Sequence, residues 1–272
     1  MILVLDNGSK RPESTRNLRR IAHAMTRRLA QTVHAVSLQH SSDIPPEALD
    51  GSPAETLEPF LRRQLRIGER DFVIVPLFFG PSRAVDAFVP EMRERLAAQF
   101  GPFDLRVARV LCPLPPGEPR LVSILEHQVR EATSAHGEQP RHLVLVDHGS
   151  PVPAVTAVRE WLASELARRF AGEAEVDQAV MERRAGRRYD FNGELLEDVL
   201  DARGAAGTPT NVVLAMQFIS PGRHAGAGGD VDDICLRAMA RWPGLRVLKS
   251  RLISEHPLFE EILYDRAAET AG

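Results

Sequence analysis

The sequence predicts an α/β protein made of two similar, doubly wound, parallel-sheet domains in tandem. Three observations support this prediction. Apolar runs such as LVLVD (143–147) are continuous, as in strands that are buried on both faces. Longer amphipathic stretches of helical period separate these runs. The pattern of the first half recurs in the second half in the same order. Strands that alternate with helices favour parallel sheets with right-handed crossovers.

The first half begins with a strand, a helix and further strands. MILVLD (1–6) is apolar up to its last residue, which predicts a buried strand. STRNLRRIAHAMTRRLAQ (14–31) carries apolar residues at three- and four-residue steps, with charges on the other side. This spacing predicts a surface helix packed on a sheet. FVIVPLFF (72–79) and the run that ends at Cys112 predict further strands.

The second half repeats this order of elements. HLVLVD (142–147), VDQAVM (176–181) and NVVLAMQFI (211–219) predict strands. AVTAVREWLASELARRFAG (154–172) has the period of a surface helix, like its counterpart in the first half. Ligands of such folds bind beyond the carboxyl ends of the strands, so we expect a site directly after these runs.

A tandem duplication explains the likeness of the halves. MILVLDNGS pairs with HLVLVDHGS, Pro81–Ala84 pairs with Pro221–His224, and DLRV pairs with GLRV, at separations of 140 or 141 residues. The polar segment SAHGEQPRH suits a linker. We therefore predict an N-terminal domain over 1–136 and a C-terminal domain over 140–272. Two unrelated α/β units that share generic strands are the alternative.

The composition excludes several classes of protein. The 272 residues are 43% apolar and carry a net charge of −3, which argues against a general nucleic-acid-binding surface. Cys112 and Cys235 form no close pair, so a disulfide framework is not expected and a reducing compartment is. No stretch reaches the length of a membrane span. We expect a cytoplasmic protein without a membrane or nucleic-acid partner.

Two histidines follow predicted strands of the second half. His148 comes directly after LVLVD, and His224 follows NVVLAMQFISPGR. Two imidazoles at neighbouring strand ends can converge on one metal ion or accept one acidic proton. The matched positions of the first half hold Asn7 and Ala84, which predicts one site per chain. Each histidine alone has a plainer interpretation as a structural or surface residue.

Other polar residues accompany these histidines. Glu182 follows VDQAVM and is a candidate third ligand or proton acceptor, or else a solvated charge. Gly149 permits a sharp turn, and Ser150 is expected to cap the following helix. The first-half region that matches Glu182 places His40 nearby. A set of arginines close to the candidates is suited to bind carboxylates, or else forms a solvated helix face: Arg183, Arg184, Arg187, Arg188 and Arg223.

The glycine-rich stretch HAGAGGDVDDI does not indicate a nucleotide site. It lacks the Lys-Ser/Thr of a phosphate-binding loop, and its acidic residues would repel an anion. We expect Asp230 or Asp232 to cap the next helix instead. DHG is similar to the Arg-His-Gly motif of phosphoglycerate mutases and acid phosphatases, but Asp147 stands where that motif has its phosphate-binding arginine.

LVDHGSP, followed about 75 residues later by FISPGRH, resembles the class II tetrapyrrole chelatases of the CbiX and SirB family. The resemblance covers both halves and implies a tandem-duplicated form, with two chelatase-like, flavodoxin-like domains around a central cleft. It implies insertion of a divalent metal substrate (Fe²⁺ or Co²⁺, with Ni²⁺ open) into sirohydrochlorin for siroheme or cobalamin biosynthesis, without a nucleotide.

The resemblance also implies roles for particular residues. His148 and His224 would be metal ligands and proton acceptors, with Glu182 as the acidic partner. Ser150, Arg183 and Arg223 are candidates to bind the tetrapyrrole. Internal duplication implies a monomer. The alternatives are a non-catalytic tetrapyrrole or metal carrier derived from a chelatase, and a phosphate-ester enzyme, which Asp147 disfavours.

Overall fold

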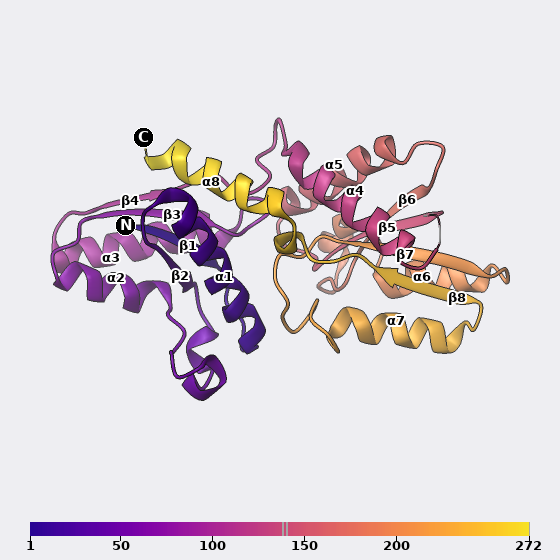
Figure 1. The fold of residues 1–272 in the computed structure, drawn as a ribbon, viewed down its shortest axis with the longest axis horizontal. Helices are drawn as coiled ribbons and strands as arrows, with labels where there is room; N and C mark the ends of the chain where they lie inside the picture. The colour runs from indigo at the N-terminus through magenta and orange to yellow at the C-terminus, as the bar shows by residue number, and fades with distance from the viewer. Residues whose placement is uncertain (138, 140, 272) are drawn as a thin grey trace. The chain divides into compact units, whose positions relative to one another are not determined.

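The computed structural model describes residues 1–137, 139 and 141–271 and confirms the predicted fold class. It contains two four-stranded parallel sheets, with strand orders β2-β1-β3-β4 and β6-β5-β7-β8 (Figure 1). The chain forms two compact units, one of residues Met1–Pro113 with Glu260–Gly272 and one of residues Leu114–Phe259. We call them unit 1 and unit 2. The predicted sequence division at 1–136 and 140–272 follows the repeat and stays a prediction.

Unit 1 is built around the first sheet. Its elements are β1 (Ile2–Asp6), α1 (Pro12–Leu29), β2 (Val33–Ser37), α2 (Leu57–Arg66), β3 (Asp71–Pro76), α3 (Val89–Phe100), β4 (Asp104–Val107) and most of α8 (Pro257–Ala271). Helix α8 is held to this unit by Arg266, whose buried guanidinium donates to the carbonyls of Val110 and Leu111. Most of the last helix of the chain therefore belongs to unit 1, with the first sheet.

Unit 2 is built around the second sheet. Its elements are α4 (Pro119–Ser134), β5 (His142–Asp147), α5 (Pro153–Arg169), β6 (Glu175–Val180), α6 (Leu196–Ala205), β7 (Thr210–Met216), α7 (Asp230–Arg241) and β8 (Leu245–Lys249). The strand prediction for 142–147 is confirmed in full, and Leu143–Val146 are completely buried. None of the described helices is both long and apolar enough to cross a membrane.

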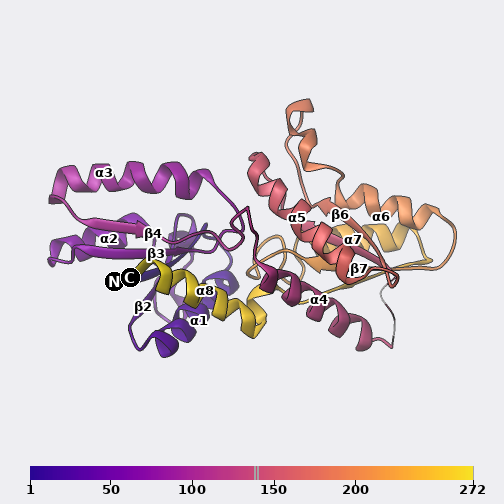
Figure 2. The ribbon, with the colours of Figure 1, turned by 90° about the horizontal axis from the view of Figure 1, so that it is seen from above.

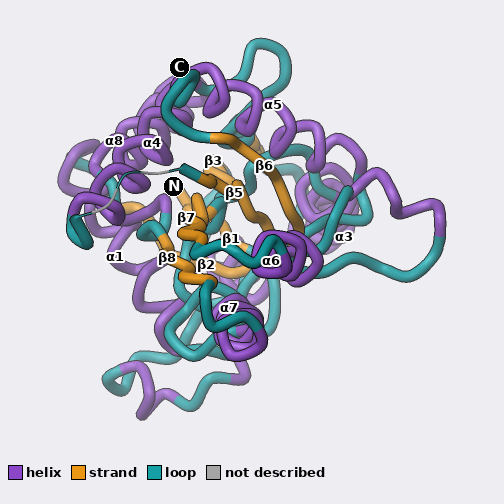
Figure 3. The backbone as a smooth tube through the Cα atoms, turned by 90° about the vertical axis from the view of Figure 1, so that its right-hand side faces the viewer, coloured by secondary structure: helices purple, strands orange, loops and turns teal. Residues whose placement is uncertain are grey.

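The order of the strands creates a place for a site in unit 2. The chain moves from β5 outward to β6, and then returns past β5 to β7. Right-handed crossovers therefore put α5 and α6 on opposite faces of the sheet. Figure 3 shows α4 and α5 on one side and α6 and α7 on the other. The loops after β5 and β7 diverge to opposite faces, which opens a crevice at their carboxyl ends, where such folds bind ligands.

Candidate functional site

The chain turns sharply directly after β5. Gly149 has a φ of +91°, and a Cβ atom there would lie 2.0 Å from the carbonyl oxygen of Glu182. Glycine is therefore required by both the backbone conformation and the close approach. The amide of Glu182 donates to the carbonyl of His148 at 3.2 Å. The turn after β5 and the end of β6 are thus fixed side by side.

This turn brings the three predicted site residues together. His148 Nε2 lies 3.2 Å from Glu182 Oε1, and the rings of His148 and His224 meet edge to face with centroids 4.4 Å apart. All three side chains reach solvent, with exposed fractions of 44%, 62% and 33% for His148, Glu182 and His224. Within residues 1–137, 139 and 141–271, no three or more His, Cys, Asp or Glu side chains are grouped to hold a metal ion. The observed arrangement is therefore one of pairwise contacts.

The hydrogen bonds of His148 orient its ring. Nδ1 lies 3.0 Å from the carbonyl oxygen of Gly149, which can only accept, so Nδ1 carries a proton. In the neutral ring Nε2 then presents a lone pair to the carboxylate of Glu182. Two acceptors at 3.2 Å repel each other unless a cation lies between them. The pair is therefore arranged to hold a proton or a metal ion.

His224 is oriented by a carboxylate that the sequence analysis assigned differently. His224 Nδ1 lies 2.6 Å from Oδ2 of Asp230, the first residue of α7. We expected Asp230 or Asp232 to cap this helix, and this prediction is wrong, because its N-cap position, Gly229, has no side-chain cap. Asp230 accepts the Nδ1 proton of His224 and leaves Nε2 available as a ligand or base. The glycine-rich sequence between His224 and Asp230 gave no sign of this contact.

Two arginines line a cavity beside His148. The cavity has a volume of about 270 Å³ and is lined by His148, Gly149, Ser150, Pro151, Glu182, Arg183 and Arg184. Arg183 donates to the carbonyl of Gly193 at 2.8 Å and lies 3.8 Å from Asp190. A hydrogen bond from Arg184 lowers the pKa of Tyr189. The predicted neighbourhood of Arg183 and Ser150 with His148 is thus present.

Arg223 does not line this cavity, and Ser150, which does, is not the cap of α5. Arg223 is 73% exposed and lies 3.5 Å from Asp230. Ser150 accepts a hydrogen bond from the amide of Val152 at 3.1 Å, whereas α5 begins at Pro153 and lacks a side-chain cap. The expected capping role of Ser150 is therefore wrong, because its hydroxyl closes a turn one residue before the helix.

A buried ion pair lies beneath the turn, and sequence reasoning missed it. Arg159 belongs to the predicted surface helix but is only 1% exposed. Its guanidinium donates to Asp147 at 2.8 Å and to Gln178 at 3.1 Å. Burial raises the pKa of Asp147, and the positive charge of Arg159 opposes that rise. Asp147, the residue directly before His148, is therefore held in place by this ion pair.

The first half keeps the same turn with different chemistry. A Cβ at Gly8 would lie 1.7 Å from the carbonyl oxygen of Gln39, and the Gln39 amide donates to Asn7. Asn7 and Gln39 thus occupy the places of His148 and Glu182, and His40 is the next residue. Asp6, the counterpart of Asp147, has a pKa raised to about 6 by burial. Ala84 begins the short helix η3 (Ala84–Phe88).

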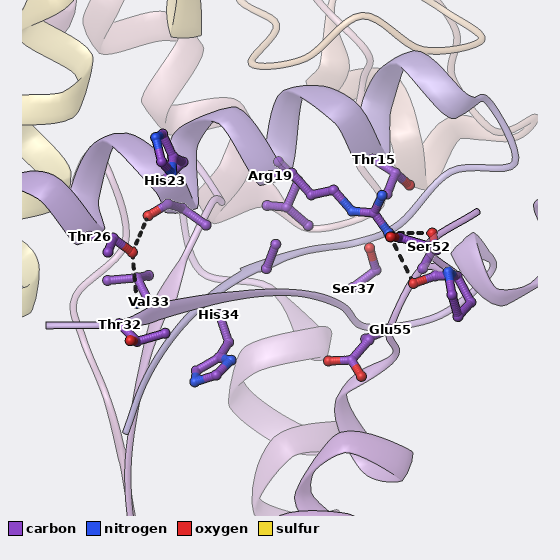
Figure 4. A pocket seen from close by; sticks show the side chains of 15 residues that line it. Thr15, Arg19, His23, Thr26, Thr32, Val33, His34, Ser37, Ser52 and Glu55 are labelled. Carbon is purple, nitrogen blue, oxygen red and sulfur yellow. Dashed lines mark hydrogen bonds between the residues drawn. The ribbon is translucent and has the colours of Figure 1, made fainter. Parts of the chain in front are cut away.

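A larger groove in unit 1 contains none of the predicted site residues. It has a volume of about 580 Å³ and lies between α1 and the edge strand β2. Figure 4 shows Arg19 reaching across it, where its guanidinium donates to the carbonyls of Ser52 and Pro53. A groove of about 380 Å³ lies at the equivalent place in unit 2, between α5 and β6. The groove is therefore a feature of the open sheet edge in this fold.

Comparisons with known proteins agree with this architecture. A sequence profile of the CbiX family matches residues 1–132 and 142–270. The structure of SirB from Bacillus subtilis with Fe³⁺ is 16% identical, with a TM-score of 0.70 and coverage of 100% of this chain and 95% of that one. SirB from Bacillus subtilis subspecies spizizenii in complex with cobalt is 17% identical, with a TM-score of 0.67 and coverage of 99% and 94%.

A third structure has the same fold. It is that of CbiX, described as the terminal enzyme for biosynthesis of siroheme in denitrifying bacteria, and it is 14% identical with a TM-score of 0.58 over 98% of both chains. No curated protein sequence matches the chain. At these identities the structural likeness establishes the fold of the whole chain.

Proposed function

The chain belongs to the CbiX family, and from this premise we propose that it inserts a divalent metal ion, Fe²⁺ or Co²⁺, into sirohydrochlorin without a nucleotide. The observation that carries the proposal is the placement of His148 Nε2 against Glu182 Oε1, with His224 alongside. The similar SirB structures hold Fe³⁺ and cobalt, which supports a metal of this class. The same residue types suit Ni²⁺ as well.

In the proposed reaction the divalent metal ion is a substrate. Imidazole nitrogen is a good ligand for borderline divalent metals. The Nε2 atoms of His148 and His224, with the carboxylate of Glu182, supply at most three ligands. Coordination positions then remain for the nitrogens of the macrocycle. Glu182 is 62% exposed, so its side chain has room to follow the ion.

The same side chains serve the proton transfer that insertion requires. Two pyrrole N–H protons must leave while the cation reaches the four ring nitrogens. Imidazole accepts protons near neutral pH, and general-base catalysis of this kind contributes roughly 10²- to 10⁴-fold. The carboxylates of Glu182 and Asp230 stabilise the positive charge that the two rings gain.

The arginines beside the cavity are suited to the carboxylates of the tetrapyrrole. Guanidinium groups bind carboxylates through paired hydrogen bonds. We assign this role to Arg183, which lines the cavity together with Ser150, and to the exposed Arg223 beside Asp230. With Asn7 and Gln39 in the first half, one site per chain is expected. A monomeric state, a cytoplasmic location and a place in siroheme or cobalamin biosynthesis stay predictions.

The direct test compares the rate of metal insertion with and without the protein. Sirohydrochlorin is mixed with Co²⁺ or Fe²⁺ under anaerobic conditions, and the absorbance change is followed over time. The proposal expects a rate well above the spontaneous rate and unchanged by removal of nucleotides. Tight binding of sirohydrochlorin without acceleration would instead identify a carrier. Absence of both would contradict the proposed function.

Asp230→Ala is expected to lower the insertion rate by roughly 10- to 100-fold, because carboxylates that orient metal-binding histidines have effects of this size. The loss follows from the freed ring of His224, whose Nδ1 proton then has no fixed acceptor. Asp233→Ala is the matched control, since this exposed aspartate lies in the same first turn of α7. Equal losses in both variants would show that the helix terminus matters, rather than the contact with His224.

A further inference from the structure

Asn192 joins the His148 turn to the arginine-bearing segment. It ends the short helix η4 (Arg187–Asn192) and is 1% exposed. Its Oδ1 accepts from the amide of Ser150 at 3.0 Å, and its Nδ2 donates to the carbonyl of Ser150 at 2.9 Å. Nδ2 also donates to the carbonyl of Tyr189 at 3.2 Å. A side-chain amide thus pairs with the backbone of Ser150 as a neighbouring strand would.

Arg159 also binds Asn192, through the backbone. Its Nη2 donates to the backbone carbonyl of Asn192 at 2.5 Å, while its other nitrogens hold Asp147 and Gln178. One buried guanidinium therefore links the end of β5, the middle of β6 and the end of η4. A buried network in which the donors are used in this way rigidifies the elements it joins.

The segment held by Asn192, residues 183–192, carries four of the arginines. Figure 2 shows it extending away from the sheet between β6 and α6. Arg183 to Arg188 are all exposed, and Arg188 stacks on the ring of Tyr189 with its guanidinium carbon 4.8 Å from the ring centroid. The bond from the Glu182 amide to the His148 carbonyl fixes the near end of this segment, and the bonds of Asn192 to Ser150 fix its far end beside the same turn.

The contacts of Arg159 and Asn192 with the His148 turn, which we call the clamp, belong to the half that has the imidazoles. Arg159 lies twelve residues after Asp147, and the residue twelve positions after Asp6 is Leu18, which is buried. The first half keeps the strand-end turn without this guanidinium. The turn alone therefore does not need Arg159, which points to a role in the site of the second half.

We propose that Asn192, seated on Arg159, is a positioning residue that holds the arginine segment at a fixed distance from His148 and so determines the affinity for a carboxylate-bearing tetrapyrrole. The inference rests on the proposed function for its ligand, but the clamp itself is a property of the fold. Asn192 acts through Arg183 and its neighbours and does not touch the substrate.

The test uses Asn192→Asp in the full chain. This change keeps the acceptor for Ser150 and removes both bonds that Nδ2 donates. Gln128→Glu is the matched control. Gln128 lies on α4 in unit 2, is also 1% exposed, and donates a side-chain hydrogen bond to the carbonyl of Leu252 at 2.9 Å. Asn192→Ser, which is smaller and uncharged, serves if the aspartate variant fails to fold.

Two measurements distinguish the structural effect of the Asn192 contacts from the proposed metal-insertion function. Amide hydrogen exchange of peptides covering 148–152 and 186–193 should become about tenfold faster in Asn192→Asp and stay unchanged in Gln128→Glu. In steady-state metal insertion, KM for sirohydrochlorin should rise about tenfold with little change in kcat or in KM for Co²⁺. A merely structural role would lower kcat, or would shift all constants in both variants.

Each outcome decides one of the two ideas. Unchanged exchange in Asn192→Asp, or an unchanged KM for sirohydrochlorin in an active protein, would overturn the positioning role. If the wild type neither binds nor metalates sirohydrochlorin, the proposed function fails, while the exchange data still decide whether Asn192 holds the segment.

Discussion

Replacing His148 and His224 together by alanine is expected to reduce metal insertion to the spontaneous rate, a loss of at least about 100-fold. The double variant removes both adjoining imidazoles, of which His148 contacts Glu182, so neither a nitrogen ligand nor an imidazole base remains there. The rate is measured from the absorbance of sirohydrochlorin as the metal enters, with Co²⁺ and Fe²⁺ in turn. Because both rings are partly exposed, the fold should persist, which far-ultraviolet circular dichroism checks.

His40→Ala is the control for this experiment. His40 follows Gln39, the residue that occupies the place of Glu182 in unit 1, so it belongs to the same kind of loop without the facing imidazole. Its replacement should leave the rate within about twofold of the wild type, since no general-base contribution is lost. A double His148/His224 variant that retains the wild-type rate would show that the metal is handled elsewhere.

Asp6→Asn is expected to stabilise the protein by about 3 kcal/mol at pH 8, because burial raises the pKa of Asp6 to about 6 from an ordinary value of 3.8. The folded state binds this proton more tightly than the unfolded state does. The wild type is therefore most stable with respect to this group below pH 3.8, and it loses that stability as the pH rises through 6. Asparagine removes the charge, so the gain should shrink to about 1 kcal/mol at pH 4.5.

Asp147→Asn, at the same position of the repeat, is expected to stabilise the protein less than Asp6→Asn does, because burial also raises the pKa of Asp147 but the positive charge of Arg159 opposes that rise. Asp147 neutralises Arg159, whose side chain is only 2% exposed, at 2.8 Å. Loss of the carboxylate charge leaves a buried guanidinium uncompensated, a cost of about 3 kcal/mol that offsets the gain from removing the buried carboxylate charge. Urea unfolding at pH 8 measures both variants by circular dichroism. Trp161 and Trp242 lie in unit 2, so their fluorescence reports the Asp147 variant specifically.

The two variants test one physical idea, namely that a buried aspartate is tolerated at this strand end for different reasons in the two halves. Equal shifts of the same sign would contradict it. Gly8 and Gly149 donate their amides to Asp6 and Asp147 respectively, so this bond is matched, whereas the side-chain partners differ: Ser37 for Asp6 and Arg159 for Asp147.

Much of the fold follows from local patterns in the sequence. Each apolar run of 142–147 or 211–219 must bury both faces, and the helical period of 154–172 must cover one of them. These requirements predict parallel strands and surface helices, and the repeat predicts two copies. The placement of His148, Glu182 and His224 near one another was predictable for the same reason, because each follows a strand of one parallel sheet.

The contacts that make these residues a site depend on the tertiary structure. Asp230 resembled a helix cap, Arg159 resembled a solvated charge, and nothing marked Asn192. Each acts through a partner from another element or across a flexible loop, at a separation that no helical or strand period specifies. The sequence alone thus determined the strands, the repeated turn and the half that carries the imidazoles. Only folding decided which charges are buried together and which way the two imidazole rings face, because that depends on atoms brought into contact by packing.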